Sequence, residues 1–185
     1  MLVLASTSPR RQQILEAAGF PFVVRAPNIP EERLPDESPR DYVHRLAEEK
    51  AFAVPISDGE IVLAGDTVVV VDQQILEKPA DPADALRMLR LLSGRDHEVI
   101  TGICLRDRSR KIVDSATTRV HFIPLTDAEL ASYVATGESM GKAGAYASQG
   151  LASRFIDRVE GGYHNVVGLP ISLVYRHLKT LGYFQ

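Results

Sequence analysis

Residues 61–76 read IVLAGDTVVVVDQQIL, and this stretch decides the class of fold. Its two β-branched runs, Ile61–Ala64 and Val68–Val71, are typical of buried strands. Gly65-Asp66-Thr67 separates the two runs, and Asp72-Gln-Gln74 is typical of a turn. The stretch therefore predicts a strand, an interruption and a second strand, followed by a turn into the next apolar pair.

The segments on either side predict both strands and helices. Ser38-Pro39 supplies a cap and a first helical residue, and Tyr42, Leu46 and Ala53 are spaced for one apolar helix face. Thr126–Glu129 fits a capping box. The further predicted strands are Leu2–Ala5, Phe22–Arg25, Glu98–Arg106 and Ile112–Phe122, and the helices are Pro9–Gly19, Pro39 to about Val54, Pro82 to Ser93, Thr126 to about Ala135, and Pro170–Gly182.

The order of these elements indicates a mixed α/β protein. A chain of 185 residues with 45% hydrophobic content is long enough to bury one sizeable core and short for two. Helices and strands do not alternate strictly, so we expect a mixed rather than a wholly parallel sheet. The sequence thus predicts a single domain over residues 1–185.

Composition disfavours several classes of function. The formal charge of -3 offers no global field for a nucleic-acid backbone, so we expect no nucleic-acid partner. The five histidines show no helical metal-ligand spacing, which disfavours a zinc hydrolase. Cys104, the single cysteine, lies in the apolar run Val99–Leu105, which predicts a buried thiol. Without a signal segment or a bilayer-spanning apolar stretch, we expect a cytoplasmic protein that binds no membrane.

The first candidate for chemistry is the segment Ser6-Thr-Ser8-Pro-Arg10-Arg11. It lies at a predicted strand end and helix start, where free backbone N–H groups and the helix dipole favour an anion. Its hydroxyls and guanidiniums add donors suited to phosphate oxygens. A helix cap followed by solvated arginines explains the same residues equally well.

The second candidate is Asp66, which stands between two very apolar runs. A charge in this position is costly unless it is paired or binds a metal, so we favour a site over a bulge at a sheet edge. Lys78 follows the same predicted sheet element and could meet phosphate near Asp66. Without further context, a lone exposed lysine is the better explanation of Lys78.

Two glycine-containing stretches, Gly141–Gly150 and Gly161–Pro170, are weaker candidates. In the first, glycines permit close backbone approach and Gln149 can pair with an amide-bearing base edge, although a flexible loop is the alternative. The second is equally well explained as a turn and the cap of a core helix. Neither a Walker lysine loop nor a Gly-x-Gly-x-x-Gly motif appears, so nucleotide binding would need another fold.

Taken together, these stretches resemble the Maf family of nucleotide pyrophosphatases over nearly the whole chain. Many matches in a fixed order are far more specific than any one of them. The matching motifs are Ser6-x-Ser8-Pro-Arg-Arg11, Tyr42-Val-x-Arg-Leu-Ala47-x-x-Lys50-Ala51, Gly65-Asp-Thr67, Lys78-Pro79, Leu92-Ser-Gly94, Thr101-Gly102, Lys142-Ala-Gly-Ala-Tyr146 with Gln149-Gly150, and Asn165-Val-Val-Gly-Leu-Pro170.

The resemblance implies an activity and roles for particular residues. The Asp-Thr pair, Arg10 and Gln149 are similar to the family branch that hydrolyses dTTP and UTP to the monophosphate and pyrophosphate, a house-cleaning of nucleotide pools. Asp66 is implied as the proton acceptor. The residues implied to govern base choice are Arg10, Thr67 and Gln149. The residues implied to engage phosphates are Arg11, Lys50, Lys78 and Lys142, with Ser6 and Ser8 beside them.

The resemblance also implies a cofactor, an architecture and an assembly. We expect a divalent cation, Mg²⁺ or Mn²⁺, with Glu31 and Asp66 as ligands, since magnesium prefers oxygen ligands and retains waters. The implied fold is a mixed twisted sheet in two lobes around a deep cleft, in a homodimer. Two positions depart from the family pattern: Pro30 stands where an aspartate usually precedes Glu31, and Gly141 stands where an aspartate usually precedes Lys142.

Two other functions stay open at this point. A pyrophosphatase for modified nucleotides such as 7-methyl-GTP belongs to the same class of enzyme. A non-catalytic nucleotide-binding regulator of cell division is the alternative from another class, through the family's link to septum formation. Asp66 together with Lys50 and Lys78 favours an enzyme, because a binding module needs no carboxylate opposed to phosphate charge.

Overall fold

The stretch that decides the fold forms one uninterrupted strand, β3 (Ile61–Val71), in the computed structural model, which describes residues 1–184. The predicted interruption at Gly65-Asp66-Thr67 is therefore wrong. Asp66 continues the strand because its side chain, only 12% exposed, is compensated by the Lys50 ammonium 2.7 Å away. Gly65 fits because its Cα faces the Gly102 carbonyl, which a Cβ would approach to 3.1 Å.

The turn after β3 is confirmed, and it leads into β4 (Gln74–Leu76). Asp72 and Gln73 adopt φ values of 49° and 63°, the left-handed pair that a two-residue hairpin requires. β4 then pairs antiparallel with β3, with Val71 opposite Gln74. The local sequence therefore determines this hairpin.

Within residues 1–184, seven strands form one mixed sheet in the order β2-β1-β3-β5-β6-β7, with β4 paired to β3. The remaining strands are β1 (Leu2–Leu4), β2 (Phe22–Val24), β5 (Asp96–Arg106), β6 (Lys111–Phe122) and β7 (Ile156–Glu160). β1 runs parallel to β2 and β3, whereas β6 and β7 are antiparallel. The predicted mixed α/β class is confirmed. β7 was not predicted, because Ile-Asp-Arg-Val-Glu has little apolar signal for a strand.

The chain forms two compact units, and β3, β5 and β6 contribute residues to both. Unit 1 comprises Met1–Asp66, Thr101–Ala116 and the chain from Gly168 onwards. Unit 2 comprises Thr67–Ile100 and Thr117–Val167. The extent of a single domain over residues 1–185 and the deep cleft between two lobes stay predictions.

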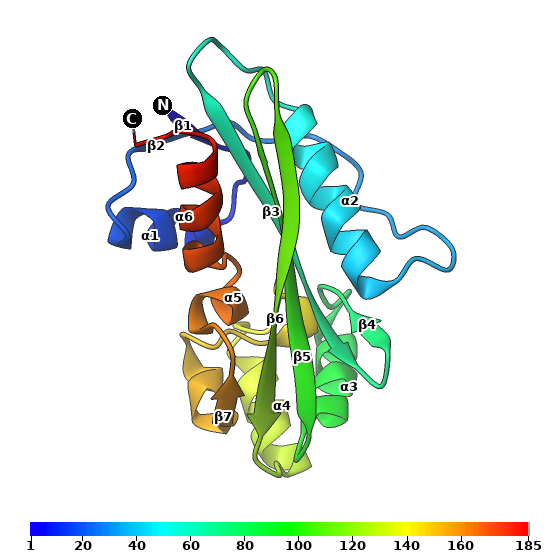
Figure 1. Ribbon diagram of the computed structural model, residues 1–185. Coiled ribbons are helices and arrows are strands. Elements are labelled where there is room, and N and C mark those ends of the chain that lie inside the picture. The colour runs from blue at the N-terminus through cyan, green and yellow to red at the C-terminus, as the bar shows by residue number, and fades with distance from the viewer. Residues whose placement is uncertain (185) are drawn as a thin grey trace. The chain divides into compact units, whose positions relative to one another are not determined.

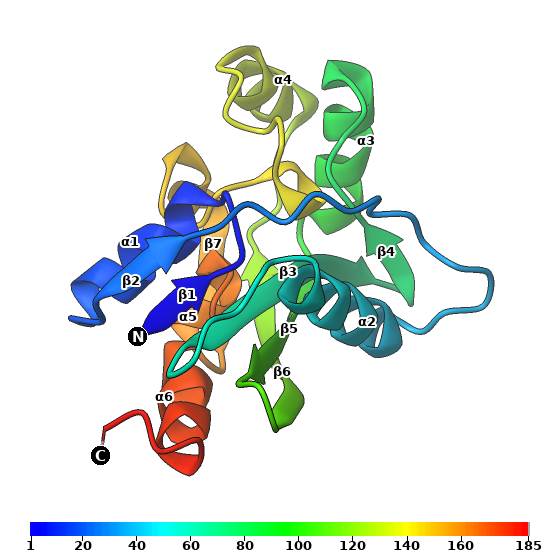
Figure 2. The same ribbon diagram turned by 90° about the horizontal axis from the view of Figure 1, so that it is seen from above.

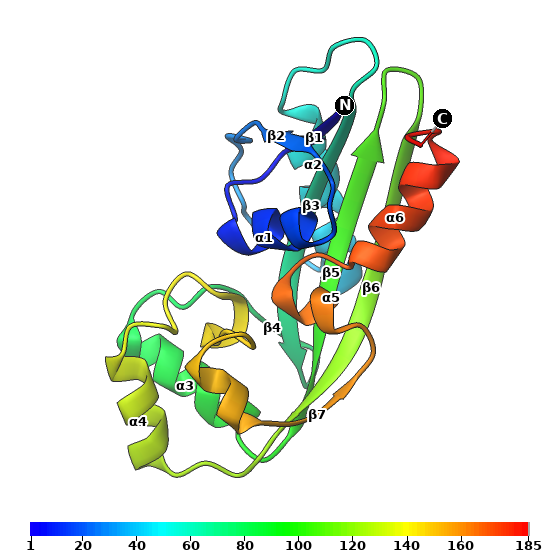
Figure 3. The same cartoon turned by 90° about the vertical axis from the view of Figure 1, so that its left-hand side faces the viewer.

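In unit 1, helix α2 (Pro39–Phe52) covers one face of the sheet, and α1 (Pro9–Ala17) and α6 (Ile171–Thr180) cover the other (Figures 1 and 3). Ser38 caps α2, because its hydroxyl accepts a hydrogen bond from the Asp41 N–H at 3.2 Å. Tyr42 and Leu46 are buried as predicted. Ala53 is not, since it is exposed and follows the helix as its C-cap.

Close packing between α2 and β5 depends on Gly102. A Cβ at this position would collide with the carbonyl of Val43, so only glycine allows the helix backbone to lie this near the strand. Behind this contact the core of unit 1 includes Val3, Ala47, Ala64 and Cys104. Cys104 is fully buried, which confirms the prediction of a buried thiol, and burial raises the pKa of this thiol to about 12.

In unit 2, helices α3 (Pro82–Leu92) and α4 (Asp127–Ala135) lie side by side (Figures 2 and 3). The capping box of α4 is confirmed: Thr126 and Glu129 bond each other's backbone N–H groups. The stretch Gly141–Gly150, for which a flexible loop was the alternative, contains the 3₁₀ turn η1 (Ala143–Ala145), and a second 3₁₀ turn, η2 (Leu151–Phe155), follows it. A short helix, α5 (Tyr163–Val167), was also not predicted. No helix within residues 1–184 is both long and apolar enough to span a bilayer.

Candidate active site

Three predicted site residues from separate stretches of unit 1 meet at one point. The Lys50 Nζ lies 2.7 Å from Asp66 Oδ1 and 2.8 Å from Glu31 Oε1. The spacing of four residues from Tyr42 through Leu46 to Lys50 keeps the lysine on the buried face of α2, and its side chain is only 7% exposed. A buried ammonium thus joins a strand carboxylate to a loop carboxylate.

The predicted anion-binding segment lies in the same unit, at the start of α1. Arg11 Nε donates to the Gly168 carbonyl at 2.8 Å, and Arg11 Nη1 donates to Ser6 Oγ at 3.3 Å. Burial lowers the pKa of Arg11, while the carboxylates of Asp66 and Glu31 raise it. The Arg11 guanidinium therefore interacts electrostatically with the same two carboxylates that bind Lys50.

Arg10 and Ser8 bear on the alternative explanation, a capped helix with solvated arginines. Arg10 is half-buried, burial lowers its pKa, and its charge lowers the pKa of Arg11. Ser8 occupies the N-cap position of α1, but within residues 1–184 its hydroxyl makes no capping bond to the helix. Arg10 and Arg11 are both partly buried at the start of α1, so neither is the fully solvated arginine of that alternative, and anion binding stays a prediction.

The other predicted site residues lie in unit 2. Lys142 Nζ donates to the Glu138 carbonyl at 2.6 Å, whereas Lys78 and Gln149 are exposed. The Gly144 N–H donates to the Glu77 carbonyl at 3.1 Å, so the loops that carry Lys78 and Lys142 are neighbours. Thr67, half-buried, follows Asp66 directly in β3. The structure thus gathers the predicted residues into two sets, one in each unit.

Gly144 shows why this loop needs glycine. Its φ of 67° lies in the left-handed region, and a Cβ would lie within 2.8 Å of the Val69 side chain. The loop therefore packs its backbone directly on β3, as the predicted close backbone approach requires.

Sequence reasoning missed two side chains that hold the loop around Gln149, the buried His97 and the half-buried Glu138. His97 Nε2 lies 2.8 Å from Tyr146 Oη, and burial lowers the pKa of His97 to about 4. On the other side of Gln149, Glu138 Oε2 accepts from the Leu151 N–H at 2.9 Å. A lone histidine and a lone glutamate carry no motif signal, so their roles emerge only from the fold.

Glu31 and Asp66 are the predicted metal ligands. Within residues 1–184, no group of three or more His, Cys, Asp or Glu side chains could hold a metal ion by itself. Magnesium is commonly held by one or two carboxylates, retained waters and substrate phosphates. Glu31 and Asp66 supply carboxylate oxygens of the kind that Mg²⁺ and Mn²⁺ prefer, but both now bind the Lys50 ammonium, so metal binding by this pair stays a prediction.

Comparison with known proteins places this chain among close relatives. The profile of a family described as Maf-like protein matches residues 1–181. A dTTP/UTP pyrophosphatase from Geobacter metallireducens is 50% identical, covering 98% of this chain and 96% of the relative. One from Koribacter versatilis is 49% identical, covering 98% and 94%. Among solved structures, a dITP/XTP pyrophosphatase from Mycobacterium abscessus is 15% identical with a TM-score of 0.45, covering 97% of this chain and 93% of that one.

Proposed function

Because the chain belongs to the Maf-like protein family, we propose that it is a nucleoside triphosphate pyrophosphatase that hydrolyses dTTP and UTP. Relatives with that name are about half identical to it over nearly their whole length. The observation that carries the proposal is the buried Lys50–Asp66 pair, which holds a carboxylate close to the Arg11 guanidinium. A carboxylate kept beside cations suits a base that acts on a polyanion.

Asp66 is the proposed proton acceptor. A water attacks the α-phosphorus and gives its proton to the Asp66 carboxylate, while the bond from that phosphorus to the bridging oxygen breaks and pyrophosphate leaves. Lys50 compensates the Asp66 charge inside the protein and orients the carboxylate through the 2.7 Å contact. The products are the nucleoside monophosphate and pyrophosphate.

Cationic side chains neutralise the phosphates. Arg10, Arg11 and the start of α1 supply guanidinium and backbone donors, and Lys78 and Lys142 supply ammonium groups. Negative charge that develops on the leaving pyrophosphate is stabilised by donors fixed in advance, such as Arg11, which the Gly168 carbonyl and Ser6 orient. Ser6 and Ser8 lie beside these cations.

We propose Mg²⁺ or Mn²⁺ as the cofactor, held by Glu31 and Asp66. When bound, such an ion neutralises phosphate charge and polarises the phosphoryl oxygens. Glu31 and Asp66 supply oxygen ligands in this arrangement, and Lys50 offsets their mutual repulsion. Removal of the ion by a chelator is expected to abolish turnover.

Pyrimidine choice is assigned to Gln149, with Arg10 and Thr67. The Gln149 amide can accept from the base N3–H and donate to a base carbonyl, a pair of bonds that uracil and thymine both satisfy. The contacts of His97 with Tyr146 and of Glu138 with Leu151 support this assignment, because they fix the backbone on both sides of Gln149.

We also propose that the protein acts in the cytoplasm as a homodimer. Both statements rest on the resemblance to the family. Sedimentation of the full chain at micromolar concentration tests the assembly: a mass of twice 20.3 kDa supports the dimer, and a mass of 20.3 kDa rejects it.

Hydrolysis of dTTP in ¹⁸O-labelled water tests the proposed reaction. Attack at the α-phosphorus places the label in dTMP and leaves pyrophosphate unlabelled. Label in pyrophosphate instead means attack at the β-phosphorus, and release of inorganic phosphate means cleavage of the terminal bond. Either of these results rejects the proposed mechanism while leaving open that the protein is a nucleotidase.

A further inference from the structure

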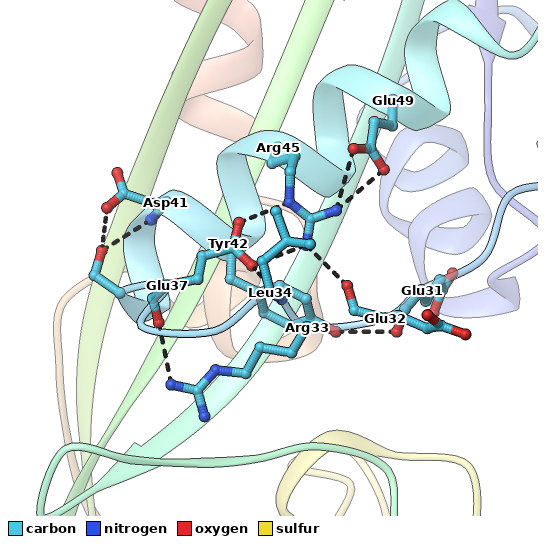
Figure 4. Close-up of polar contacts among 10 residues, drawn as sticks. Glu31, Glu32, Arg33, Leu34, Glu37, Asp41, Tyr42, Arg45 and Glu49 are labelled. Carbon is cyan, nitrogen blue, oxygen red and sulfur yellow. Dashed lines mark hydrogen bonds and ion pairs between the residues drawn. The ribbon is translucent and has the colours of Figure 1, made fainter.

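Arg45, in the middle of α2, holds the segment that carries Glu31 (Figure 4). Its Nε and Nη2 lie 2.7 and 2.8 Å from the two carboxylate oxygens of Glu37. The same Nη2 donates to the Glu32 carbonyl at 2.9 Å. One guanidinium therefore binds a side chain at the end of the segment and the backbone next to Glu31.

The segment between β2 and α2 contains no helix or strand, so its position depends on such contacts. Glu37 extends these contacts along the segment. Its Oε2, which binds Arg45, also accepts a hydrogen bond from the Leu34 N–H at 3.2 Å. Hydrogen bonds from Arg45 lower the pKa of the Glu37 carboxyl. The Glu37 carboxylate thus stays charged and bound through the ordinary pH range.

Tyr42 adds a second contact from the same helix. Its hydroxyl donates to the Glu31 carbonyl at 3.4 Å, and the Arg45 guanidinium lies 5.6 Å from the centre of its ring (Figure 4). About two turns after Tyr42 along α2, Lys50 binds the Glu31 carboxylate at 2.8 Å. Helix α2 therefore holds both the backbone and the carboxylate of Glu31.

We propose that Arg45 is a positioning residue that sets the Glu31 carboxylate for the divalent cation of the reaction. The inference rests on the proposed function, which makes Glu31 a metal ligand. It gives a task to Tyr42 and Arg45, two members of the Tyr42-Val-x-Arg-Leu-Ala47-x-x-Lys50 motif that contribute no reacting group. Partners that orient a metal ligand commonly change metal affinity about 10–100-fold when they are removed.

The simpler explanation is that Arg45 only stabilises α2. Its Nη1 does bind Glu49 at 3.1 Å, one helical turn away, but such surface pairs stabilise a helix only weakly. Glu49→Gln removes this pair and leaves the Glu32 and Glu37 contacts in place. It is therefore the matched control for Arg45→Gln.

The test uses the full chain as wild type, Arg45→Gln, Glu31→Gln, the double variant and Glu49→Gln. Amide hydrogen exchange over residues 29–37 is measured without nucleotide or metal, and dTTP turnover is measured against Mg²⁺ concentration. We expect Arg45→Gln to speed exchange in this segment and to raise the half-saturating Mg²⁺ concentration about 10–100-fold, with kcat at saturating Mg²⁺ little changed. In the Glu31→Gln background, Arg45→Gln should add less than about a twofold further effect.

Unchanged exchange in Arg45→Gln overturns the proposal. So does a loss of turnover that is the same at every Mg²⁺ concentration, or that appears equally with and without Glu31. Wild-type protein that turns over no dTTP rejects the proposed function alone, because the exchange comparison still decides whether Arg45 orders the Glu31 segment. Arg45→Lys, which retains the charge but not the fork of donors, should fall between wild type and Arg45→Gln.

Discussion

Lys50 and Asp66, 16 residues apart in sequence, form a buried ion pair with 2.7 Å between Nζ and Oδ1. Glu31 binds the same ammonium from the exposed side. Removing one partner of a buried pair leaves the other charge unpaired, whereas replacing both partners with uncharged side chains leaves no unpaired charge. The pair thus connects the stability of unit 1 to the chemistry assigned to Asp66.

Lys50→Met is expected to destabilise the fold by about 3–5 kcal/mol, because it leaves the buried Asp66 carboxylate without its counterion. Lys50→Met combined with Asp66→Asn should recover most of that loss. Urea unfolding of both variants and of Asp66→Asn alone measures the coupling. Additive effects of the two substitutions would show that the two side chains do not depend on each other.

Gln149→Glu should lower kcat/KM for dTTP and UTP about 10–100-fold, since the carboxylate cannot donate to a base carbonyl and loses one hydrogen bond. The half-saturating Mg²⁺ concentration should not change. Gln74→Glu, which adds the same charge at the exposed first residue of β4, is the control. If the Gln149→Glu variant ranks the nucleotides by kcat/KM in the same order as wild type, Gln149 does not take part in base binding.

His97 should make stability fall in mild acid. Its folded pKa of about 4 lies below the value of roughly 6.5 expected in an unfolded chain, so the unfolded state binds more protons between these values. The contribution of neutral His97 is fully present above about pH 6.5 and is lost as the pH falls towards 4.

Unfolding free energies at several pH values test this sign. His97→Gln should flatten the slope between about pH 6.5 and 4, whereas His164→Gln, at an exposed position of α5, should retain it. Equal slopes in wild type and His97→Gln would contradict the burial of a neutral imidazole beside Tyr146.

Cys104 should resist alkylation in the native protein. It is fully buried, and burial raises the pKa of its thiol to about 12, so very little thiolate exists at neutral pH. Iodoacetamide at pH 8 should label Cys104 only after denaturation, and Cys104→Ala should turn over dTTP at nearly the wild-type rate. Rapid labelling of the folded protein would show that the core around Cys104 opens.

Local signals in the sequence predicted much of the fold. Ser38, Thr126 and the Asp72-Gln73 turn were all identified, because caps and tight turns depend on residues within one helical turn or hairpin. The predicted break in β3 was wrong because a charged residue in an apolar strand suggests an interruption until its partner is known. Lys50, on another element, is that partner.

The candidate site shows the same limit. Motifs identified Asp66, Lys50 and Arg11 as residues of interest. Only the fold shows that Lys50 contacts Asp66 and that Arg11 interacts electrostatically with Asp66. The supporting contacts of Arg45 and His97 could not be predicted, since each depends on a partner brought close by tertiary packing. The roles of the site residues in the reaction stay predictions.

The most direct test of the account is pyrophosphate release from dTTP, UTP, CTP, GTP, ATP and 7-methyl-GTP by wild type, Asp66→Asn and the control Asp114→Asn. Asp114 lies on β6, contacts His177 and has no assigned role in the reaction. Each nucleotide is assayed with Mg²⁺, with Mn²⁺ and with a chelator. We expect metal-dependent turnover of dTTP and UTP by wild type and Asp114→Asn, and a loss of about 10²–10⁴-fold in Asp66→Asn, which should still bind dTTP. Retained turnover in Asp66→Asn, or a wild-type preference for 7-methyl-GTP, would contradict the account.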